Sequence, residues 1–131
     1  MISVSQAEQI HKILIDSFGG SHRTRDSGAL ASALLRPFQT FDGKELYSSA
    51  NEKAAALIES ILINHPFIDG NKRIGYVLLR VFLLENNFDI TATEDEKYNF
   101  IISIASGELK FEQILMWLEK NTTEITSKEI L

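Results

Sequence analysis

The stretch HPFIDGNKR, residues 65–73, decides how this chain folds and where its chemistry lies. It separates two segments in which apolar residues recur at helical spacing, so both segments are expected to be helices that reach the core. Pro66 disfavours a helical conformation at His65, and the first helix should therefore end at about Asn64. The second helix should begin at about Gly70. The loop between them is predicted to place several polar side chains at a buried junction.

The start of the second helix has the features of an anion-binding site. The backbone N–H groups of Gly70, Asn71, Lys72 and Arg73 lie in the first helical turn, where they have no intrahelical partner. Together with the positive end of the helix dipole, they form a nest for an anion. The ammonium of Lys72 and the guanidinium of Arg73 add full charges that suit phosphate oxygens. These four residues are therefore the candidate nucleotide-binding or phosphate-binding residues.

Three other residues of the loop have both a functional and a structural interpretation. Asp69 could hold a Mg²⁺ ion that bridges bound phosphates. Asp is also a preferred N-cap, and the structural role as N-cap of the second helix is the favoured interpretation. His65 is the candidate catalytic base, because an imidazole can take a proton from a hydroxyl near neutral pH. Its alternative role is a favourable charge at a helix C-terminus. Phe67 is expected to bury its ring and anchor the loop.

The rest of the chain predicts an all-α domain of about six helices. The helix that follows the loop is apolar on nearly every side and is expected at the centre of the domain. Beyond Asn121 the chain becomes polar, and this tail is expected to be frayed or to be ordered by a partner. The helices are expected at residues 5–18, 26–35, 49–64, 70–84, 93–107 and 111–118.

Local signals place some boundaries. Asp42-Gly43 between strand-compatible residues predicts a small β-hairpin within residues 38–47. Asp26 is a candidate N-cap, and the segments 49–52 and 93–96 are candidate helix starts. The first helix is expected to start at Ser5, where SQAE fits a capping box, and to bury one face made of Ile10, Ile13, Leu14 and Phe18.

Length and composition exclude several classes of protein. With 131 residues, 44% of them hydrophobic and 24% charged, the chain (residues 1–131) is expected to form one globular domain and not a disordered segment. A net charge of −5 gives no global positive field for nucleic acid or an acidic membrane. The chain has no cysteine, no apolar run long enough to cross a bilayer and no signal-peptide pattern at its start, so a cytoplasmic location is expected.

The loop resembles the signature of the Fic/Doc family, H-x-F-x-[DE]-G-N-[GK]-R, and matches it at every fixed position. The sequence RDSGALASALLRP at residues 25–37 is similar to the family segment R-D-x-G-L-L-E-S-A-L-x-R-P, and EKAAA at residues 52–56 is similar to the segment that leads to the histidine. The resemblance covers about residues 25–120. It implies the helical bundle of that family, with His65 as the catalytic residue.

Two positions point to one branch of the family. Fic enzymes usually end the motif in G-N-G-R-x-x-R and transfer AMP from ATP to a protein hydroxyl, whereas this chain has Lys72 and Tyr76 in place of the second glycine and the last arginine. Both are typical of the Doc branch, the death-on-curing toxins. That resemblance implies a kinase that uses ATP and Mg²⁺ to phosphorylate a threonine of translation elongation factor Tu, which arrests translation.

Two alternatives remain open at this point. Gly70 and Pro66 look more like Fic than like some Doc loops, so AMP transfer is the second candidate. A catalytically silent module that binds an antitoxin and acts as a co-repressor is the third. The inhibitory pattern [ST]-x-x-x-E-[GN] of many Fic proteins is absent, and the resemblance implies instead a separate Phd-like antitoxin. In relatives the hairpin is a flap that pairs with the target polypeptide; a solvated connector is the equal alternative here.

Overall fold

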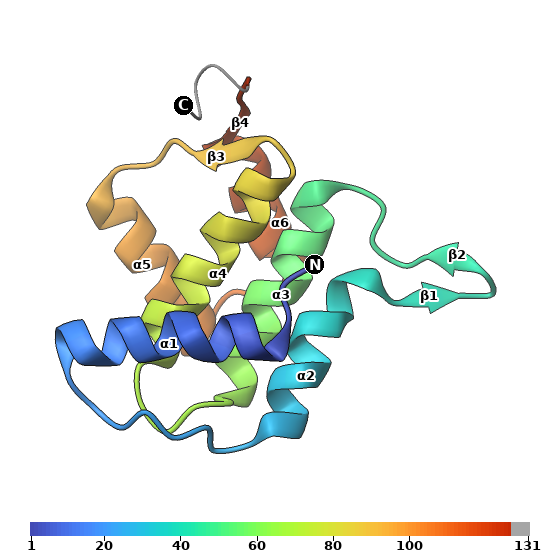
Figure 1. Cartoon of the computed structure of the whole chain (residues 1–131). Helices are drawn as coiled ribbons and strands as arrows, with labels where there is room; N and C mark the ends of the chain where they lie inside the picture. The colour runs from blue at the N-terminus through green and yellow to red at the C-terminus, as the bar shows by residue number, and fades with distance from the viewer. Residues whose placement is uncertain (127–131) are drawn as a thin grey trace.

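The computed structural model describes residues 1–126, and in this part of the chain helices dominate (Figure 1). The fold is all-α with a small β-hairpin, which confirms the predicted class. The helices are α1 (Val4–Phe18), α2 (Ser27–Leu35), α3 (Ala50–Asn64), α4 (Asn71–Glu85), α5 (Glu94–Ala105) and α6 (Phe111–Asn121), and a short 3-10 helix, η1 (Arg36–Phe38), follows α2.

Three of the six helices in residues 1–126 begin where capping residues predict. The side chains of Asp26, Ser49 and Thr93 each accept a backbone N–H in the first turn of α2, α3 and α5. The capping residue of α1 lies two positions earlier than expected, because the capping box is between Ser3 and Gln6. This earlier start buries Ile2 and Ala7, which are placed as a hydrophobic staple across the cap.

The buried face of α1 also differs from the prediction. Ala7, His11 and Ile15 are buried, whereas Ile13 and Phe18 are 65% and 60% exposed. Ile10 and Leu14 are only partly buried. The prediction considered only apolar residues and left His11 out, although a buried imidazole is tolerated when it has a hydrogen-bond partner.

The innermost helix is α3 and not α4. Helix α3 contacts α2, η1, α4, α5 and α6, and every residue from Ala54 to Ile58 is buried. Three of those five residues are alanines, whose small side chains let neighbouring helices approach closely. Helix α4 packs against α1, α3, α5 and the strand that follows it, but it leaves Lys72, Arg73 and Arg80 exposed. The central place predicted for residues 70–84 therefore belongs to the preceding helix.

Gly75 lies where α4 meets α3 most closely. A Cβ atom at this position would be 2.9 Å from Leu62 Cδ2 and 3.1 Å from Ile58 Cδ1, and both of these side chains are buried. We expect Gly75→Ala to lower the free energy of unfolding by about 1 kcal/mol, because overpacking costs roughly 1–3 kcal/mol and the better helix propensity of alanine returns up to about 1. Urea denaturation measures the change. In a double-mutant cycle, Leu62→Ala should relieve part of the cost; additive effects would contradict the predicted clash.

The hairpin predicted around Asp42-Gly43 is present. Strands β1 (Thr40–Phe41) and β2 (Lys44–Glu45) pair in antiparallel register, and the two turn residues have the positive φ angles of 54° and 77° that a two-residue hairpin turn requires. An ion pair of 3.2 Å between Lys53 Nζ and Glu45 Oε1 holds the hairpin to the first turn of α3. Figure 1 shows it projecting from the body beside that turn, at the end of α3 opposite to residue 65.

The start of the polar tail, which was expected to be frayed or ordered by a partner, forms a second small sheet with another segment of the same chain. Strand β4 (Thr122–Glu124) pairs with β3 (Phe88–Ile90), and the N–H of Ile125 donates to the carbonyl of Asn87. Backbone hydrogen bonds order this segment. Because its side chains are polar, their pattern does not predict that pairing. Residues 127–131 of the expected tail lie outside the described residues. None of the helices in residues 1–126 combines the length and apolarity that a membrane span requires.

Candidate functional site

The loop begins with His65 in a conformation that is unusual for its residue type. His65 ends α3 with φ 47° and ψ 62°, the left-handed region in which side chains other than glycine are strained. Arg25 supports this bend, because its guanidinium donates to the carbonyls of His65 (2.7 Å from Nε) and of Asn64. The backbone N–H groups of Arg25 and Asp26 also donate to the carbonyl of Pro66, at 2.8 and 3.1 Å. Strain of this kind is commonly stored at functional sites.

The position of Arg25 argues against a purely structural role for His65 as a favourable charge at the C-terminus of α3. The last carbonyls of α3, where a histidine charge would interact with the helix dipole, already accept the guanidinium of Arg25. Within the described residues, the His65 ring itself has no hydrogen bond or ion pair, and the residue is exposed. Its imidazole is therefore available to a ligand.

Phe67 and Asn71 close the loop. The Phe67 side chain is 1% exposed, and its ring stacks on that of His11 with centroids 3.8 Å apart. The side-chain amide of Asn71 accepts the N–H of Phe67 (3.0 Å) and donates to its carbonyl (2.9 Å). Because the amide oxygen and one of its N–H groups are used in this way, we expect the backbone N–H of Asn71 to be its main contact with a phosphate. The side chain of this residue shapes the loop.

Asp69 is not the N-cap of α4. Gly70 occupies the cap position with a φ of 76°, and no side chain caps the helix. Asp69 instead accepts the N–H of Ser21 at Oδ2 (2.8 Å), while its carbonyl accepts Nε2–H of His11 (2.8 Å). Gly70 occupies the N-cap position because the left-handed backbone conformation there suits a residue without a side chain. The favoured interpretation of Asp69 was therefore wrong.

The surroundings of Asp69 limit the kind of metal site it can form. Within residues 1–126 no group of three or more His, Cys, Asp or Glu side chains could hold a metal ion by itself. Mg²⁺ is often bound by only one or two carboxylates, with phosphates and water supplying the other oxygens. A single exposed carboxylate fits Mg²⁺ that arrives with a nucleotide.

The polar residues of the loop and the start of α4 line one cavity. Its volume is about 430 Å³, and it brings together the candidate base, the carboxylate and the anion nest that the sequence predicted. The cavity is lined by His65, Ile68, Asp69, Gly70, Asn71, Lys72, Arg73 and Tyr98. Phe67 is not among the lining residues and belongs to the hydrophobic core.

The two cations at the start of α4 are not neutralised by carboxylates. Arg80, further along the same helix, pairs with Asp89 (3.1 Å), and its hydrogen bonds lower the pKa of Asp89. In contrast, Lys72 and Arg73 form no ion pair within the part of the chain that the structure describes. The Arg73 guanidinium lies over the ring of Phe18, 4.3 Å from its centroid. Two free positive charges beside a helix N-terminus make this cavity attractive to an anion despite the negative net charge of the chain.

Residue-by-residue reasoning missed four residues that shape the site. His11 is on the buried face of α1, and its spacing of four from Ala7 and Ile15 was a signal that could have revealed it. Ser21, Phe18 and Tyr98 reach the site from distant parts of the chain, so no local pattern marks them. Arg25 was named only as part of the segment that resembles the family. That resemblance gave no sign that the Arg25 side chain supports the backbone of His65.

Comparison with known proteins agrees with this geometry. The family model described as the Fic/DOC family matches residues 1–83, which include the whole loop and most of α4. The protein named Toxin Doc of Mycolicibacterium smegmatis is 39% identical to the chain over 85 residues, which cover 60% of this chain and 65% of that toxin. The chain thus spans slightly less than two thirds of the length of this relative.

Proposed function

The chain belongs to the Fic/DOC family, and from this premise we propose that it is the toxin of a toxin–antitoxin pair and a protein kinase that uses ATP. One observation carries the proposal: a single cavity holds a free imidazole, a carboxylate and two unpaired cations at a helix N-terminus. These groups match the needs of phosphoryl transfer, in which positioning and charge neutralisation supply most of the catalysis. The similarity to Toxin Doc supports the toxin branch.

Each group has a role in the proposed reaction. The backbone N–H groups of the first turn of α4, with Lys72 and Arg73, hold the phosphates of ATP and neutralise their charge. Asp69 would hold a Mg²⁺ ion that arrives with the nucleotide, and such an ion would supply further neutralisation of the charge on the phosphate oxygens. His65 takes the proton of the acceptor hydroxyl as its oxygen attacks the γ-phosphorus. The bond between the γ-phosphorus and the oxygen that bridges it to the β-phosphate breaks, and ADP leaves. The proton remains on the imidazole of His65.

The acceptor and the partner are proposed from the resemblance to Doc. We propose a threonine of translation elongation factor Tu as the acceptor, in the cytoplasm, and arrest of protein synthesis as the result. A Phd-like antitoxin is the proposed regulator, and the name of the toxin relative supports the existence of such a partner.

The position of the hairpin sets a condition on how a target would bind. Residue 65 lies at the far end of α3, and a helix of 15 residues is about 22 Å long. A target strand added to the hairpin would therefore need roughly six or seven extended residues to reach the imidazole. The role of the hairpin as a target-binding flap stays a prediction, and it requires an acceptor on a long extended segment.

One assay distinguishes the candidate functions. The purified chain is incubated with bacterial lysate, Mg²⁺ and ATP labelled at the α or the γ phosphorus, and His65→Ala is run in parallel. Protein labelled only from the γ position is the expected result. Label from the α position would instead establish AMP transfer, and no label from either would contradict an enzyme and favour a binding module.

Lys72 provides a test of how the phosphates are held. We expect Lys72→Gly to lower γ-phosphoryl transfer about ten- to a hundredfold, because charged hydrogen bonds contribute roughly 1.5–3 kcal/mol. AMP transfer should rise only slightly, since Tyr76 still stands where Fic enzymes have their last arginine. The labelled-ATP assay measures both activities. Lys72→Ala separates loss of charge from the added glycine, and Lys120→Ala on α6 is the control; unchanged γ transfer in Lys72→Gly would contradict the role of the ammonium.

A further inference from the structure

His11 is a buried polar residue to which the proposed reaction gives no role. Its side chain lies on the inner face of α1 and is 1% exposed. Among residues 1–126 the other buried polar residue is Ser60, which accepts a hydrogen bond from Arg36 (2.9 Å). A polar group without access to water is costly unless it is hydrogen-bonded. The partner of the imidazole therefore indicates what His11 does.

This partner is the backbone of the loop that precedes α4. Nε2 of His11 lies 2.8 Å from the carbonyl oxygen of Asp69. A carbonyl oxygen can only accept a hydrogen bond, so Nε2 carries a proton and donates it. The carbonyl belongs to the peptide unit that joins Asp69 to Gly70, and the N–H of the same unit is that of Gly70. His11 is thus bonded to the peptide that supplies the first donor of the anion nest.

The direction of this carbonyl fixes the direction of that N–H. No peptide bond in residues 1–126 is cis, and in a trans peptide the C=O and N–H groups point in opposite directions. Because the carbonyl of Asp69 is turned to His11, the N–H of Gly70 points away from His11. Gly70 lines the cavity at the loop, whereas His11 does not. Among the described residues this N–H has no acceptor, so it is available to a phosphate oxygen.

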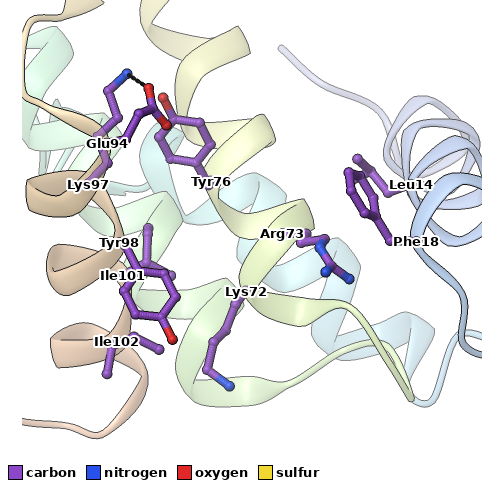
Figure 2. Close-up of a pocket in the computed structure, with 10 residues that line it drawn as sticks. All are labelled: Leu14, Phe18, Lys72, Arg73, Tyr76, Glu94, Lys97, Tyr98, Ile101 and Ile102. Atoms are coloured by element: carbon purple, nitrogen blue, oxygen red, sulfur yellow. Dashed lines mark hydrogen bonds and ion pairs between the residues drawn. The ribbon is translucent and has the colours of Figure 1, made fainter.

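The two cations of the nest do not fix the position of a phosphate by themselves. Figure 2 shows them at the start of α4 with side chains that point in different directions, Arg73 toward the Phe18 ring on α1 and Lys72 away from α1. Long side chains of this kind have many rotamers, whereas a backbone N–H is as fixed as the peptide plane that carries it. The orientation of the backbone donors therefore decides where a phosphate lies between the cations.

The Asp69–Gly70 peptide needs a contact that holds its plane. Gly70 has φ 76° and ψ 17°, and glycine adopts positive and negative φ about equally well, so its own backbone does little to restrict the plane. A rotated plane would turn the carbonyl oxygen of Asp69 into the cavity, where its partial negative charge would repel a phosphate. Helix α1 opposes this rotation. A Cβ atom at Gly70 would be 3.6 Å from Nε2 of His11 and 3.3 Å from Cδ1 of Ile15, so both side chains lie against this corner.

Building on the proposed function, we propose that His11 is a positioning residue for the phosphates of ATP. Its Nε2–H holds the Asp69–Gly70 peptide so that the N–H of Gly70 faces the phosphate chain. A hydrogen bond to the carbonyl also polarises the peptide and strengthens the bond that its N–H donates to an anion. The stack of the imidazole on the Phe67 ring, with centroids 3.8 Å apart, keeps the donor in place. The imidazole of His11 takes no part in the proton transfer.

Two variants separate the donor from the ring. His11→Phe keeps an aromatic ring that can stack on Phe67 but has no donor, whereas His11→Gln keeps an N–H donor and lacks the ring. Inorganic triphosphate without Mg²⁺ is the probe, because its binding reports on the anion nest and not on a metal at Asp69. Isothermal titration calorimetry should show that His11→Phe binds triphosphate about tenfold more weakly than the wild type, the effect of one lost hydrogen bond to a charged group.

His11→Gln should restore the affinity for triphosphate to within about threefold of the wild type, because the carbonyl of Asp69 again has a donor. Ser60→Ala, which removes the other buried polar side chain, is the matched control and should bind triphosphate as the wild type does. Urea denaturation shows whether each variant is folded at the temperature of the titration. A purely structural role predicts the opposite order, with affinity lost in His11→Gln and kept in His11→Phe. That order, or equal affinities in folded variants, would overturn the proposal.

NMR spectroscopy of the unaltered chain decides the case if His11→Phe does not fold. The nitrogen and proton signals of the His11 ring should identify an imidazole protonated at Nε2, and the amide proton of Gly70 should shift when triphosphate is added. A neutral ring protonated only at Nδ1 would contradict the positioning role. So would a Gly70 amide that stays unmoved while those of Lys72 and Arg73 shift, or a wild type that does not bind triphosphate.

The labelled-ATP assay distinguishes failure of this inference from failure of the proposed function. If the positioning role is overturned and the wild type still transfers the γ-phosphoryl group, the proposed kinase stands. If the wild type neither binds triphosphate nor transfers label, both proposals are overturned.

Discussion

Replacement of His65 by alanine is expected to lower γ-phosphoryl transfer by about 10²–10⁴-fold, the usual contribution of a general base. The free energy of unfolding should change little. The residue is exposed, and its ring makes no hydrogen bond or ion pair within residues 1–126. Transfer rates with γ-labelled ATP and urea denaturation together test both halves of this expectation.

The backbone at this position supplies matched variants. Because φ is 47°, His65→Gly should relieve strain and stabilise the fold by up to about 1 kcal/mol, and His65→Asn should be tolerated, since asparagine adopts the left-handed region more readily than most residues. All three variants should be similarly inactive. Wild-type transfer by any of them would exclude His65 as the base. A large loss of stability in His65→Ala alone would assign the histidine a structural role.

The features that sequence predicted well are those encoded within a few neighbouring residues. Asp26, Ser49 and Thr93 cap helices because each side chain accepts a backbone N–H three positions later. Asp42-Gly43 marks the hairpin because its turn needs two positive φ angles. The same local logic placed the loop at residues 65–73 between two helices.

The features that sequence missed depend on contacts between distant segments. Asp69 resembles an N-cap in a short window, but its carboxylate bonds to the N–H of Ser21, 48 positions away. His11 is buried because a carbonyl 58 positions along the chain accepts its Nε2–H. Likewise, β4 is ordered by pairing with a strand on the other side of α5 and α6 in the sequence. A single sequence carries no direct record of such pairings.

Replacement of Phe67 by alanine should produce the largest loss of stability among the variants considered. We expect the free energy of unfolding to fall by about 3–5 kcal/mol, since the ring is almost completely buried and its removal leaves a cavity. For a domain whose total stability is about 5–15 kcal/mol, this is a substantial fraction. Urea denaturation followed by the fluorescence of Trp117, the one tryptophan of the chain, which stacks on Phe100, measures the change.

Two controls separate burial from aromatic stacking. Phe41→Ala removes the same ring from an exposed site on the hairpin and should cost almost nothing, because Phe41 is 78% exposed. Phe67→Leu keeps most of the apolar volume but loses the stack on His11, and should cost about 1 kcal/mol, the usual value of an aromatic pair. Equal effects of Phe67→Ala and Phe41→Ala would contradict the anchoring role.

Phe67→Ala should also lower the rate of phosphoryl transfer. Both hydrogen bonds of the Asn71 side chain end on the backbone of Phe67, and the carbonyl of the preceding residue accepts two N–H groups that lead into α2. Loss of the ring frees this loop to shift relative to the N–H groups of α4. Because a displacement of about 1 Å can cost on the order of a hundredfold in rate, Phe67→Ala should lose most of its phosphoryl transfer even at temperatures where it stays folded. Phe67→Leu should retain more, and full activity in folded Phe67→Ala would show that the loop is positioned by other contacts.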